Sequence, residues 1–430
     1  MIPSSIALSN YRSFGGPDLT TLELRPITLL FGRNGAGKSS LIRSLPLIAD
    51  SLMPDRNELD VLNFNRRLEP FDLSFENLRW KGRKETDEPG ISLGLRWSGD
   101  AILQDVEWIV RDADDWTRIV VDSMNVHGQE GLSMQWRIKR GEQAERALTY
   151  EVTRQNAPSS EGSTESVEFH GLLPRLPDDS LTVRELQTRL QAFASSVIWL
   201  RSLRPAPKRY TPWKGAVRWS LRSDGSDAPI VLWGERTDIL PEVSKFYEDN
   251  FGLELRVEKE LRKREVRTFV RNRSRTGLDV DLVDTGEGLS EVLPVVTALA
   301  MVRRHKERGG PSILAIEEPG SHLHPDLQRA LMERVCEVVH EARPRIVLET
   351  HSEIALLAIQ RAVVEETLAP EDVVFYWVDQ NSATGCSTIQ KIELNRAGRL
   401  QGNWPPDAFQ QDITLAADLQ DARDKLEGRR

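Results

Sequence analysis

The residues best suited to chemistry lie near the start of the chain, in the segment from Gly32 to Ser39. This segment fits the pattern G-x-x-x-x-G-K-[ST], in which glycines let backbone N–H groups surround phosphate oxygens. In this pattern Lys38 is a catalytic residue that contacts the β- and γ-phosphates, and the Ser39 hydroxyl binds Mg²⁺. The sequence therefore predicts a site for ATP and Mg²⁺, formed by Gly32, Arg33, Asn34, Gly35, Ala36, Gly37, Lys38, Ser39 and Ser40.

Two adjacent acids follow a second apolar segment, and both are candidates for phosphoryl-transfer chemistry. Residues 312–316 predict a buried strand, and Glu317 and Glu318 come directly after it. The first acid at the end of such a strand is expected to support the metal, because Mg²⁺ prefers oxygen ligands. The second acid is expected to polarise the attacking water as a general base. A solvated helix cap has the same pattern, so this interpretation depends on the phosphate-binding pattern upstream.

A histidine follows a third predicted strand, over residues 345–349. His351 is expected to face the crevice in which open α/β sheets bind ligands, where it would sense the γ-phosphate by a hydrogen bond. His322 and His324 have a spacing that a metal site can use, but no further ligand cluster lies near them in the sequence. A loop at a subunit contact is the favoured interpretation of these two histidines.

A glycine-rich segment containing Thr285, Gly286 and Gly288 precedes a helix predicted over residues 290–304. Helix N-termini with glycines bind anions, so this segment is a candidate second phosphate-binding element. An ordinary capped helix start has the same composition. The residues alone leave both interpretations open.

The elements that must position these residues differ between the ends and the middle of the chain. Residues 312–378 alternate between strand and helix patterns, which predicts a largely parallel sheet, as in α/β folds. Short alternating segments across residues 91–169 instead predict an antiparallel sheet. We expect four parts: the N-terminal half of an ATPase core (1–90), a β-rich insert (91–200), a basic segment followed by a helix and strands (201–283), and the C-terminal half of the core (284–430).

The composition of the 430-residue chain excludes several protein classes. Hydrophobic residues make up 39% and charged residues 29%, which is typical of a globular enzyme. No apolar stretch approaches the roughly 20 residues of a membrane helix, and the N-terminus shows no secretion signal. Two cysteines are too few for a disulfide framework, so the cytoplasm is the expected compartment. The net charge of −9 argues against a surface covered with basic residues for nucleic acid.

One basic segment, from Arg201 to Arg222, contains no acid and is interleaved with Tyr210, Trp213 and Trp219. Basic residues with aromatics suit phosphate contact and base stacking, so nucleic acid is a candidate partner. A solvated face, or an arginine cluster near the nucleotide, also accounts for this composition.

Taken in order, these motifs resemble those of the ABC-type ATPases of the RecF, SMC and overcoming-lysogenization-defect groups. The matching segments are residues 8–14 with the phosphate loop (N-terminal lobe), 317–325 (Walker B motif and D-loop) and 349–352 (switch histidine). Finer features are similar to stand-alone AAA-annotated ATPases of bacterial defence and prophage loci; these are residues 169–174, 200–205, 283–294 and 402–405. The resemblance implies an ABC-type fold with a mixed or parallel central sheet, an N-terminal antiparallel β-lobe and a β-rich insert.

The resemblance also implies a composite site. In that family ATP lies between the phosphate loop of one subunit and the signature turn of another. This assigns Thr285, Gly286 and Gly288 to the partner's γ-phosphate and implies a homodimer or higher homo-oligomer. Glu317 stands where the family usually has an aspartate.

The resemblance favours an ATP-hydrolysing switch, as the sensor or scaffold ATPase of an anti-phage defence system. About 80 residues follow His351, which is short for the nuclease domain of the overcoming-lysogenization-defect group. Any destructive activity is therefore expected in a separate effector protein. A DNA-binding ATPase of repair or recombination is the alternative, and the basic segment is its internal support.

Overall fold

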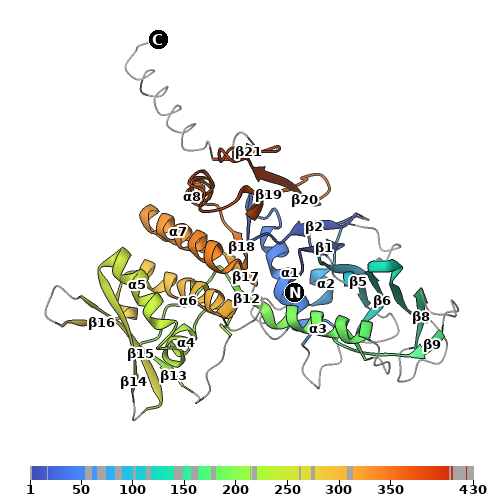
Figure 1. The fold of residues 1–430 in the computed structure, drawn as a ribbon, viewed down its shortest axis with the longest axis horizontal. Coiled ribbons are helices and arrows are strands. Elements are labelled where there is room, and N and C mark those ends of the chain that lie inside the picture. The colour runs from blue at the N-terminus through green and yellow to red at the C-terminus, as the bar shows by residue number, and fades with distance from the viewer. Residues whose placement is uncertain are drawn as a thin grey trace.

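The structure is a computed structural model with three main sheets (Figure 1). It describes residues 2–16, 18–53, 61–64, 74–82, 90–99, 103–112, 118–139, 149–155, 163–175, 181–213, 215, 220–260, 263–272, 277–307, 313–405, 408–409 and 423.

A seven-stranded sheet forms the centre of the described chain, in the order β12-β17-β18-β3-β19-β20-β21. Its strands are β12 (Val197–Leu200), β17 (Ile313–Glu317), β18 (Arg345–Glu349), β3 (Ile27–Gly32), β19 (Val373–Gln380), β20 (Ser387–Leu394) and β21 (Leu400–Gln401). The strands from β12 to β19 run parallel, and the last two are antiparallel. The residues that follow β3, β17 and β18 therefore meet at one edge, where α/β sheets bind ligands.

Helices cover both faces of this sheet because its strands alternate between two apolar cores. On β3, Leu30 packs into a core with α1 (Lys38–Ser51) and α3 (Leu181–Ser196). Leu29 and Phe31 point to the opposite face, as alternation along a strand requires. That second core contains α6 (Glu287–Glu307), α7 (Pro325–Ala342) and α8 (Glu353–Val364). Both faces of the central sheet are thus buried, as in other parallel sheets.

The N-terminal lobe is an eight-stranded antiparallel sheet in the order β2-β1-β4-β5-β6-β7-β8-β9. Its strands are β2 (Thr20–Glu23), β1 (Ser5–Ser9), β4 (Ile91–Arg96), β5 (Leu103–Asp112), β6 (Ile119–Gly128), β7 (Ser133–Ile138), β8 (Thr149–Gln155) and β9 (Ser163–Ser166). The register pairs Ser5 with Arg96 and Ser9 with Ser92, so β1 and β4 lie in one sheet. The predicted fold class is confirmed, but the β-rich segment extends the N-terminal lobe across residue 90. The predicted part 91–200 also contributes β12 to the central sheet, because all four β12 residues are buried beside β17.

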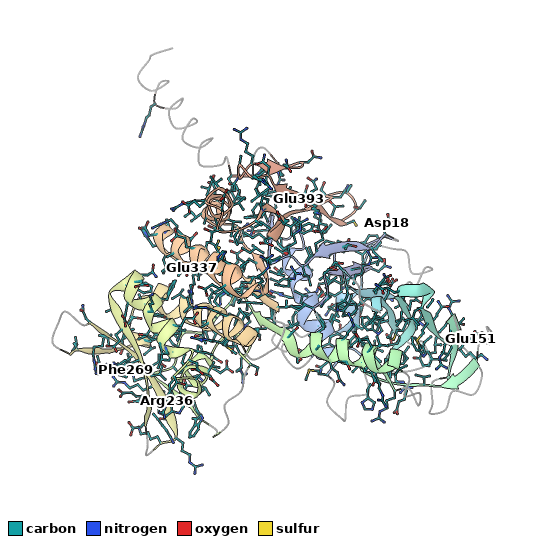
Figure 2. The ribbon with its side chains drawn as sticks, in the orientation of Figure 1. Asp18, Glu151, Arg236, Phe269, Glu337 and Glu393 are labelled. Atoms are coloured by element: carbon teal, nitrogen blue, oxygen red, sulfur yellow. The ribbon has the colours of Figure 1, made fainter. Side chains whose placement is uncertain are left out.

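A four-stranded sheet lies at the other end of the molecule from β5–β9 (Figure 1). It contains β13 (Tyr210–Pro212), β14 (Leu253–Glu260), β15 (Glu265–Asn272) and β16 (Asp279–Asp281), with α4 (Ala228–Gly234) and α5 (Leu240–Phe251) beside it. Phe269 of β15 (Figure 2) is fully buried there. The 3₁₀-turn η3 (Leu282–Asp284) then leads into α6, which begins before the predicted start at residue 290.

Shorter elements complete the described chain: α2 (Phe75–Leu78), η2 (Gln129–Gly131), β10 (Glu168–His170), β11 (Leu173–Arg175) and η4 (Pro370–Asp372). No helix among the described residues is long and apolar enough to span a membrane.

Candidate nucleotide site

The predicted phosphate loop connects β3 to α1. Gly32 has a φ of 146°, and a Cβ there would lie 2.1 Å from the carbonyl oxygen of Val378. Gly37 has a φ of 106°, and a Cβ there would lie 2.6 Å from the Ser13 hydroxyl. Both positions therefore require glycine. No side chain caps the start of α1, which leaves its first N–H groups and its positive dipole end directed at the loop.

Lys38 is 4% exposed and lies between the loop and two acids. Its Nζ donates hydrogen bonds to the carbonyl oxygens of Gly32 and Arg33, each at 2.9 Å. Burial lowers the pKa of Lys38, and the carboxylates of Glu349 and Glu318 oppose this shift. The ammonium group is thus held at the mouth of the loop, where phosphate oxygens can replace the two carbonyls.

Glu317 ends β17 as predicted, but its carboxylate is fully engaged by protein groups. Arg43 of α1 donates two hydrogen bonds of 2.7 Å to its two oxygens, and Trp199 Nε1 donates one at 3.2 Å. The Glu317 side chain is 1% exposed. This bidentate pair gives Glu317 a charge partner within the fold.

Glu349 is the carboxylate that the structure brings to Ser39. The Ser39 hydroxyl donates a 2.7 Å hydrogen bond to Glu349 Oε1, and Glu349 Oε2 is buried without a hydrogen-bond partner. Burial raises the pKa of Glu349 to about 7. The sequence assigned the metal to Ser39 and Glu317 and gave no role to Glu349. The signal was nevertheless present, because Glu349 also ends an apolar strand.

Glu318 and His351 lie side by side at this edge of the sheet. His351 Nε2 lies 3.6 Å from Glu318 Oε1, an oxygen that is buried without a hydrogen-bond partner. Burial raises the pKa of Glu318, and Lys38 opposes this shift. Burial and the charge of Lys38 lower the pKa of His351, which favours its neutral form. An acid of raised pKa beside a neutral imidazole is a typical acid–base arrangement.

The backbone of Glu318 is strained. Its φ is 45°, a left-handed conformation that costs a non-glycine residue about 1–3 kcal/mol. Its N–H donates to the Glu349 carbonyl oxygen at 2.8 Å, which ties the turn after β17 to the end of β18. Such strain is retained where the surrounding structure fixes the residue, as at many functional sites.

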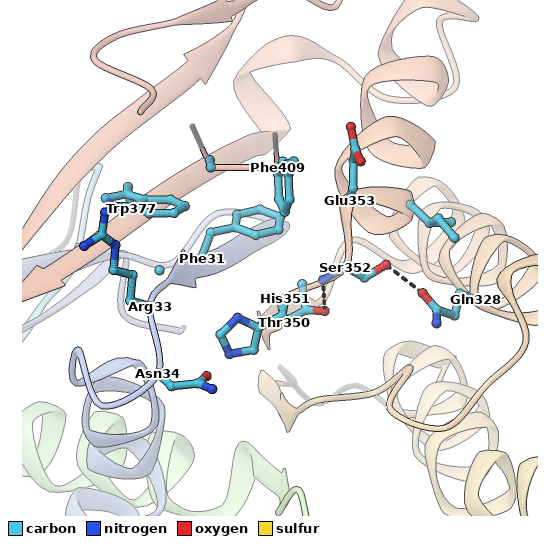
Figure 3. Close-up of a pocket in the computed structure, with 13 residues that line it drawn as sticks. Phe31, Arg33, Asn34, Gln328, Thr350, His351, Ser352, Glu353, Trp377 and Phe409 are labelled. Carbon is cyan, nitrogen blue, oxygen red and sulfur yellow. Dashed lines mark hydrogen bonds between the residues drawn. The ribbon is translucent and has the colours of Figure 1, made fainter. Parts of the chain in front are cut away.

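Two adjoining pockets lie at this edge of the sheet. One, of about 360 Å³, is lined by Asn34, Gly35, Gly37, Lys38, Ser39, Ser40, Glu349 and His351. The other, of about 640 Å³, shares Asn34 and His351 and has an aromatic wall of Phe31, Trp377 and Phe409 (Figure 3). Figure 3 also shows Ser352, which donates a 2.7 Å hydrogen bond to Gln328 of α7. Ser352 thus links the residues after β18 to α7, and His351 lines both pockets together with Asn34 of the phosphate loop.

The residues of this site could hold Mg²⁺ if phosphate oxygens bind the ion as well. Ser39 and Glu349 offer hard oxygen atoms, and one Glu349 oxygen is a buried acceptor without a partner. Within the described ranges, no cluster of three or more His, Cys, Asp or Glu residues could hold a metal alone. Mg²⁺ at phosphate sites commonly uses one or two protein ligands, with substrate phosphates and waters supplying the rest.

The predicted signature residues do not line the nucleotide pocket of their own chain. Thr285, Gly286 and Gly288 lie between η3 and the first turn of α6. A Cβ at Gly288 would contact Leu323 at 3.6 Å, in the loop between Glu318 and α7. Arg209 donates hydrogen bonds of 2.7 and 2.8 Å to Asp284, which fixes the start of this turn.

Two family models match separate segments of the chain. One, described as an AAA domain, matches residues 5–85, which include the phosphate loop. The other, described as "AAA domain, putative AbiEii toxin, Type IV TA system", matches residues 178–358, which include Glu318 and His351. Over these two segments the chain matches P-loop ATPases of the AAA type. Its core combines a parallel sheet with an antiparallel lobe, the arrangement expected of the ABC type.

Solved structures similar to this AAA-type chain include three SMC head domains. The head bound to the C-winged helix domain of ScpA has 11% identity and a TM-score of 0.49, covering 92% of this chain and 100% of that one. The Thermotoga maritima head has 14% identity and a TM-score of 0.39, covering 90% and 98%. The Pyrococcus furiosus head, bound to the C-terminal domain of ScpA, has 10% identity and a TM-score of 0.44, covering 91% and 96%. No curated protein matches the chain.

The basic segment of this AAA-type chain is largely engaged in contacts within the protein. Arg204 binds backbone carbonyls near Glu318, Arg209 binds Asp281 and Asp284, and Arg201 and Arg222 lie within 4 Å of Asp224. Lys259 covers the Trp213 ring at 4.3 Å. Lys214, Arg218 and Trp219 lie outside the described residues. The described arginines of this segment thus have acidic or carbonyl partners within the chain, and Arg209 binds the residue that precedes Thr285.

Proposed function

We propose that this chain binds ATP with Mg²⁺ and hydrolyses it to ADP and phosphate. One observation carries the proposal. Lys38, Ser39, Glu349, Glu318 and His351 converge at the carboxyl ends of three neighbouring parallel strands, around the uncapped start of α1. A lysine, a hydroxyl, a metal-compatible acid, a base and an imidazole are the groups that phosphoryl transfer requires.

Each residue has a role that follows from its position. The loop N–H groups and Lys38 bind the phosphates, and Ser39 and Glu349 would hold Mg²⁺. Bound Mg²⁺ supplies positive charge that offsets the charge of the phosphate oxygens. Glu318 accepts a proton from water, which its raised pKa favours near neutral pH. Neutral His351 hydrogen-bonds the terminal phosphate beside Glu318.

We propose further that a second copy completes the site through its Thr285, Gly286 and Gly288. Two features support this proposal. The signature turn is partly exposed, and a Cβ at Gly286 would meet no atom within 4 Å, so a phosphate can approach its backbone. The same turn does not line the pocket of its own chain, which supports its presentation by a second copy.

Mass in solution by light scattering, together with phosphate release, tests both proposals. The parent protein is expected to release phosphate and to dimerise with ATP and Mg²⁺. Glu318→Gln is expected to lower kcat by about 10²–10⁴-fold, because it removes the general base, and to remain dimeric with ATP. Glu371→Gln, an exposed acid of η4, is the matched control and is expected to behave as the parent.

Two results would contradict these assignments. Hydrolysis by Glu318→Gln at the parental rate would show that Glu318 is not the base. Hydrolysis by a protein that stays monomeric with ATP would show that the signature turn of a second copy is not needed.

We propose as the biological role a cytoplasmic, nucleotide-driven switch of a bacterial defence system that acts through a separate effector protein. The description of the family matched at residues 178–358 names a putative toxin of a toxin–antitoxin system, which supports a defence context. A DNA-repair ATPase is less well supported, because the described arginines of the basic segment bind partners within the chain. ATP-dependent DNA binding that weakens with salt would favour the repair role instead.

A further inference from the structure

Arg204 reaches the turn that carries the proposed base. It lies in the connection between β12 and β13, and its guanidinium contacts the backbone at the end of β17. Nη2 donates a 2.8 Å hydrogen bond to the Glu317 carbonyl oxygen and a 3.4 Å bond to that of Glu318. Nη1 donates to the Glu318 carbonyl oxygen at 3.5 Å. A cationic fork thus binds two successive carbonyls, a contact stronger than neutral hydrogen bonds.

These carbonyls belong to the strained part of the turn. The φ of Glu318 is 45°, and its N–H is bound to the Glu349 carbonyl oxygen at 2.8 Å. With the N–H held on one side and the two carbonyls on the other, the peptide planes around Glu318 have a fixed orientation. That orientation directs the Glu318 carboxylate toward Lys38 and His351.

We propose that Arg204 is the positioning residue of Glu318. It holds the left-handed backbone that places the base in the nucleotide pocket, and it does not contact the nucleotide. This inference rests on the proposed function, in which Glu318 accepts the proton of water. A basic segment that resembled a nucleic-acid contact in the sequence thus serves the catalytic turn instead.

The other side of Arg204 faces the signature helix. Burial lowers the pKa of Arg204 to about 10, and the charge of Glu291, on the first turns of α6, is the largest opposing influence. Arg204 Nε is a buried donor without a hydrogen-bond partner, and Glu291 Oε2 is a buried acceptor without one. Buried polar groups are rarely left unpaired. Arg204 therefore lies near the first turns of α6 as well as beside the turn that carries Glu318.

Steady-state phosphate release, on the full chain with ATP and Mg²⁺, tests the inference. Arg204→Gln is expected to lower kcat by about 10²-fold with little change in KM, because displacing a reacting group by about 1 Å has this effect. Arg204→Lys keeps the charge and a donor, and it is expected to restore part of kcat. Arg201→Gln is the matched control, since Arg201 lies near Asp224 at 3.9 Å, and it is expected to keep the parental kcat and KM.

A crystal structure of Arg204→Gln provides a readout that does not depend on hydrolysis. The φ of Glu318 is expected to leave the left-handed region, with its carboxylate displaced from His351. An unchanged Glu318 would overturn the inference, as would a parental kcat in Arg204→Gln. A parent protein that releases no phosphate would instead refute the proposed function, and the crystal structure would still decide the role of Arg204.

Discussion

The ends of β17 and β18 place two acids side by side, but the protein treats them in opposite ways. The register pairs Glu317 directly with Glu349. Glu317 receives both nitrogens of an arginine fork and an indole N–H. Among the described residues, Glu349 receives a serine hydroxyl, and its other carboxylate oxygen is buried without a hydrogen-bond partner. A buried acid whose charge is already balanced by a bound arginine supports the fold, whereas a buried acid with no cation hydrogen-bonded to it is suited to bind one.

The electrostatics of Glu349 agree with this distinction. Burial raises its pKa to about 7, and the neighbouring Glu317 contributes to the shift. A divalent cation beside Ser39 would favour the ionised form of Glu349. The comparison therefore supports the proposal that Mg²⁺ binds at the end of β18 and that Glu317, at the end of β17, has a structural role. The two parts of this proposal can be tested separately.

Removing Arg43, the charge partner of Glu317 at the end of β17, is expected to have the largest effect on the free energy of unfolding. Arg43→Met leaves the Glu317 carboxylate buried beside β12 without its charge partner. Breaking a buried ion pair in this way costs about 3–5 kcal/mol. Urea unfolding in the absence of nucleotide measures this loss.

The double variant Arg43→Met/Glu317→Gln is the control for Arg43→Met. It removes both charges and is expected to recover much of the loss, as replaced buried pairs often do. A single Arg43→Met variant as stable as the parent would show that the ion pair between Arg43 and Glu317 does not stabilise the fold.

Neutralising Glu349, at the end of β18, is expected to raise the free energy of unfolding, by less than Arg43→Met lowers it. Folding raises the pKa of Glu349 from 4.5 to about 7, so its stabilising contribution is full below pH 4.5 and is lost as pH rises through 7. Glu349→Gln carries no such penalty and still accepts a hydrogen bond from Ser39. At pH 8 the variant is expected to exceed the parent by up to about 3 kcal/mol in the free energy of unfolding.

Urea unfolding of parent and Glu349→Gln at pH 5.5 and pH 8, without nucleotide or metal, measures this difference. The gap between the two proteins is expected to widen with pH. If the difference in free energy of unfolding stays constant or narrows from pH 5.5 to pH 8, Glu349 is not destabilised by ionisation in the folded protein. Glu371→Gln again serves as the exposed control.

Local features of the site could be predicted from the sequence. The glycines between Gly32 and Ser39 determine the geometry of the loop locally. The strand before it and the helix after it follow from hydrophobic spacing. Glu318 and His351 each follow an apolar strand, so each could be placed after a strand of the parallel sheet, although their contact was not predicted. The assignment of the signature residues to a second copy stays a prediction, because it concerns a contact between chains.

Long-range partners could not be predicted from the sequence. Ser39 and Glu349 are 310 positions apart, and Arg43 and Glu317 are 274 apart. Which acid meets the serine depends on strand order and on the side of α1 that each residue occupies, and local patterns do not specify either. Arg204 binds backbone carbonyls, which every residue has, so no side-chain type in the sequence identifies its partners.

The Mg²⁺ dependence of ATP binding, measured by calorimetry on Glu349→Gln and Glu317→Gln, tests the comparison most directly. Glu349→Gln is expected to bind ATP with an affinity that no longer responds to Mg²⁺, because it lacks the carboxylate beside Ser39. Glu317→Gln is expected to keep the parental response. The reverse result, with the response lost in Glu317→Gln and kept in Glu349→Gln, would contradict the assignment of the metal to the end of β18.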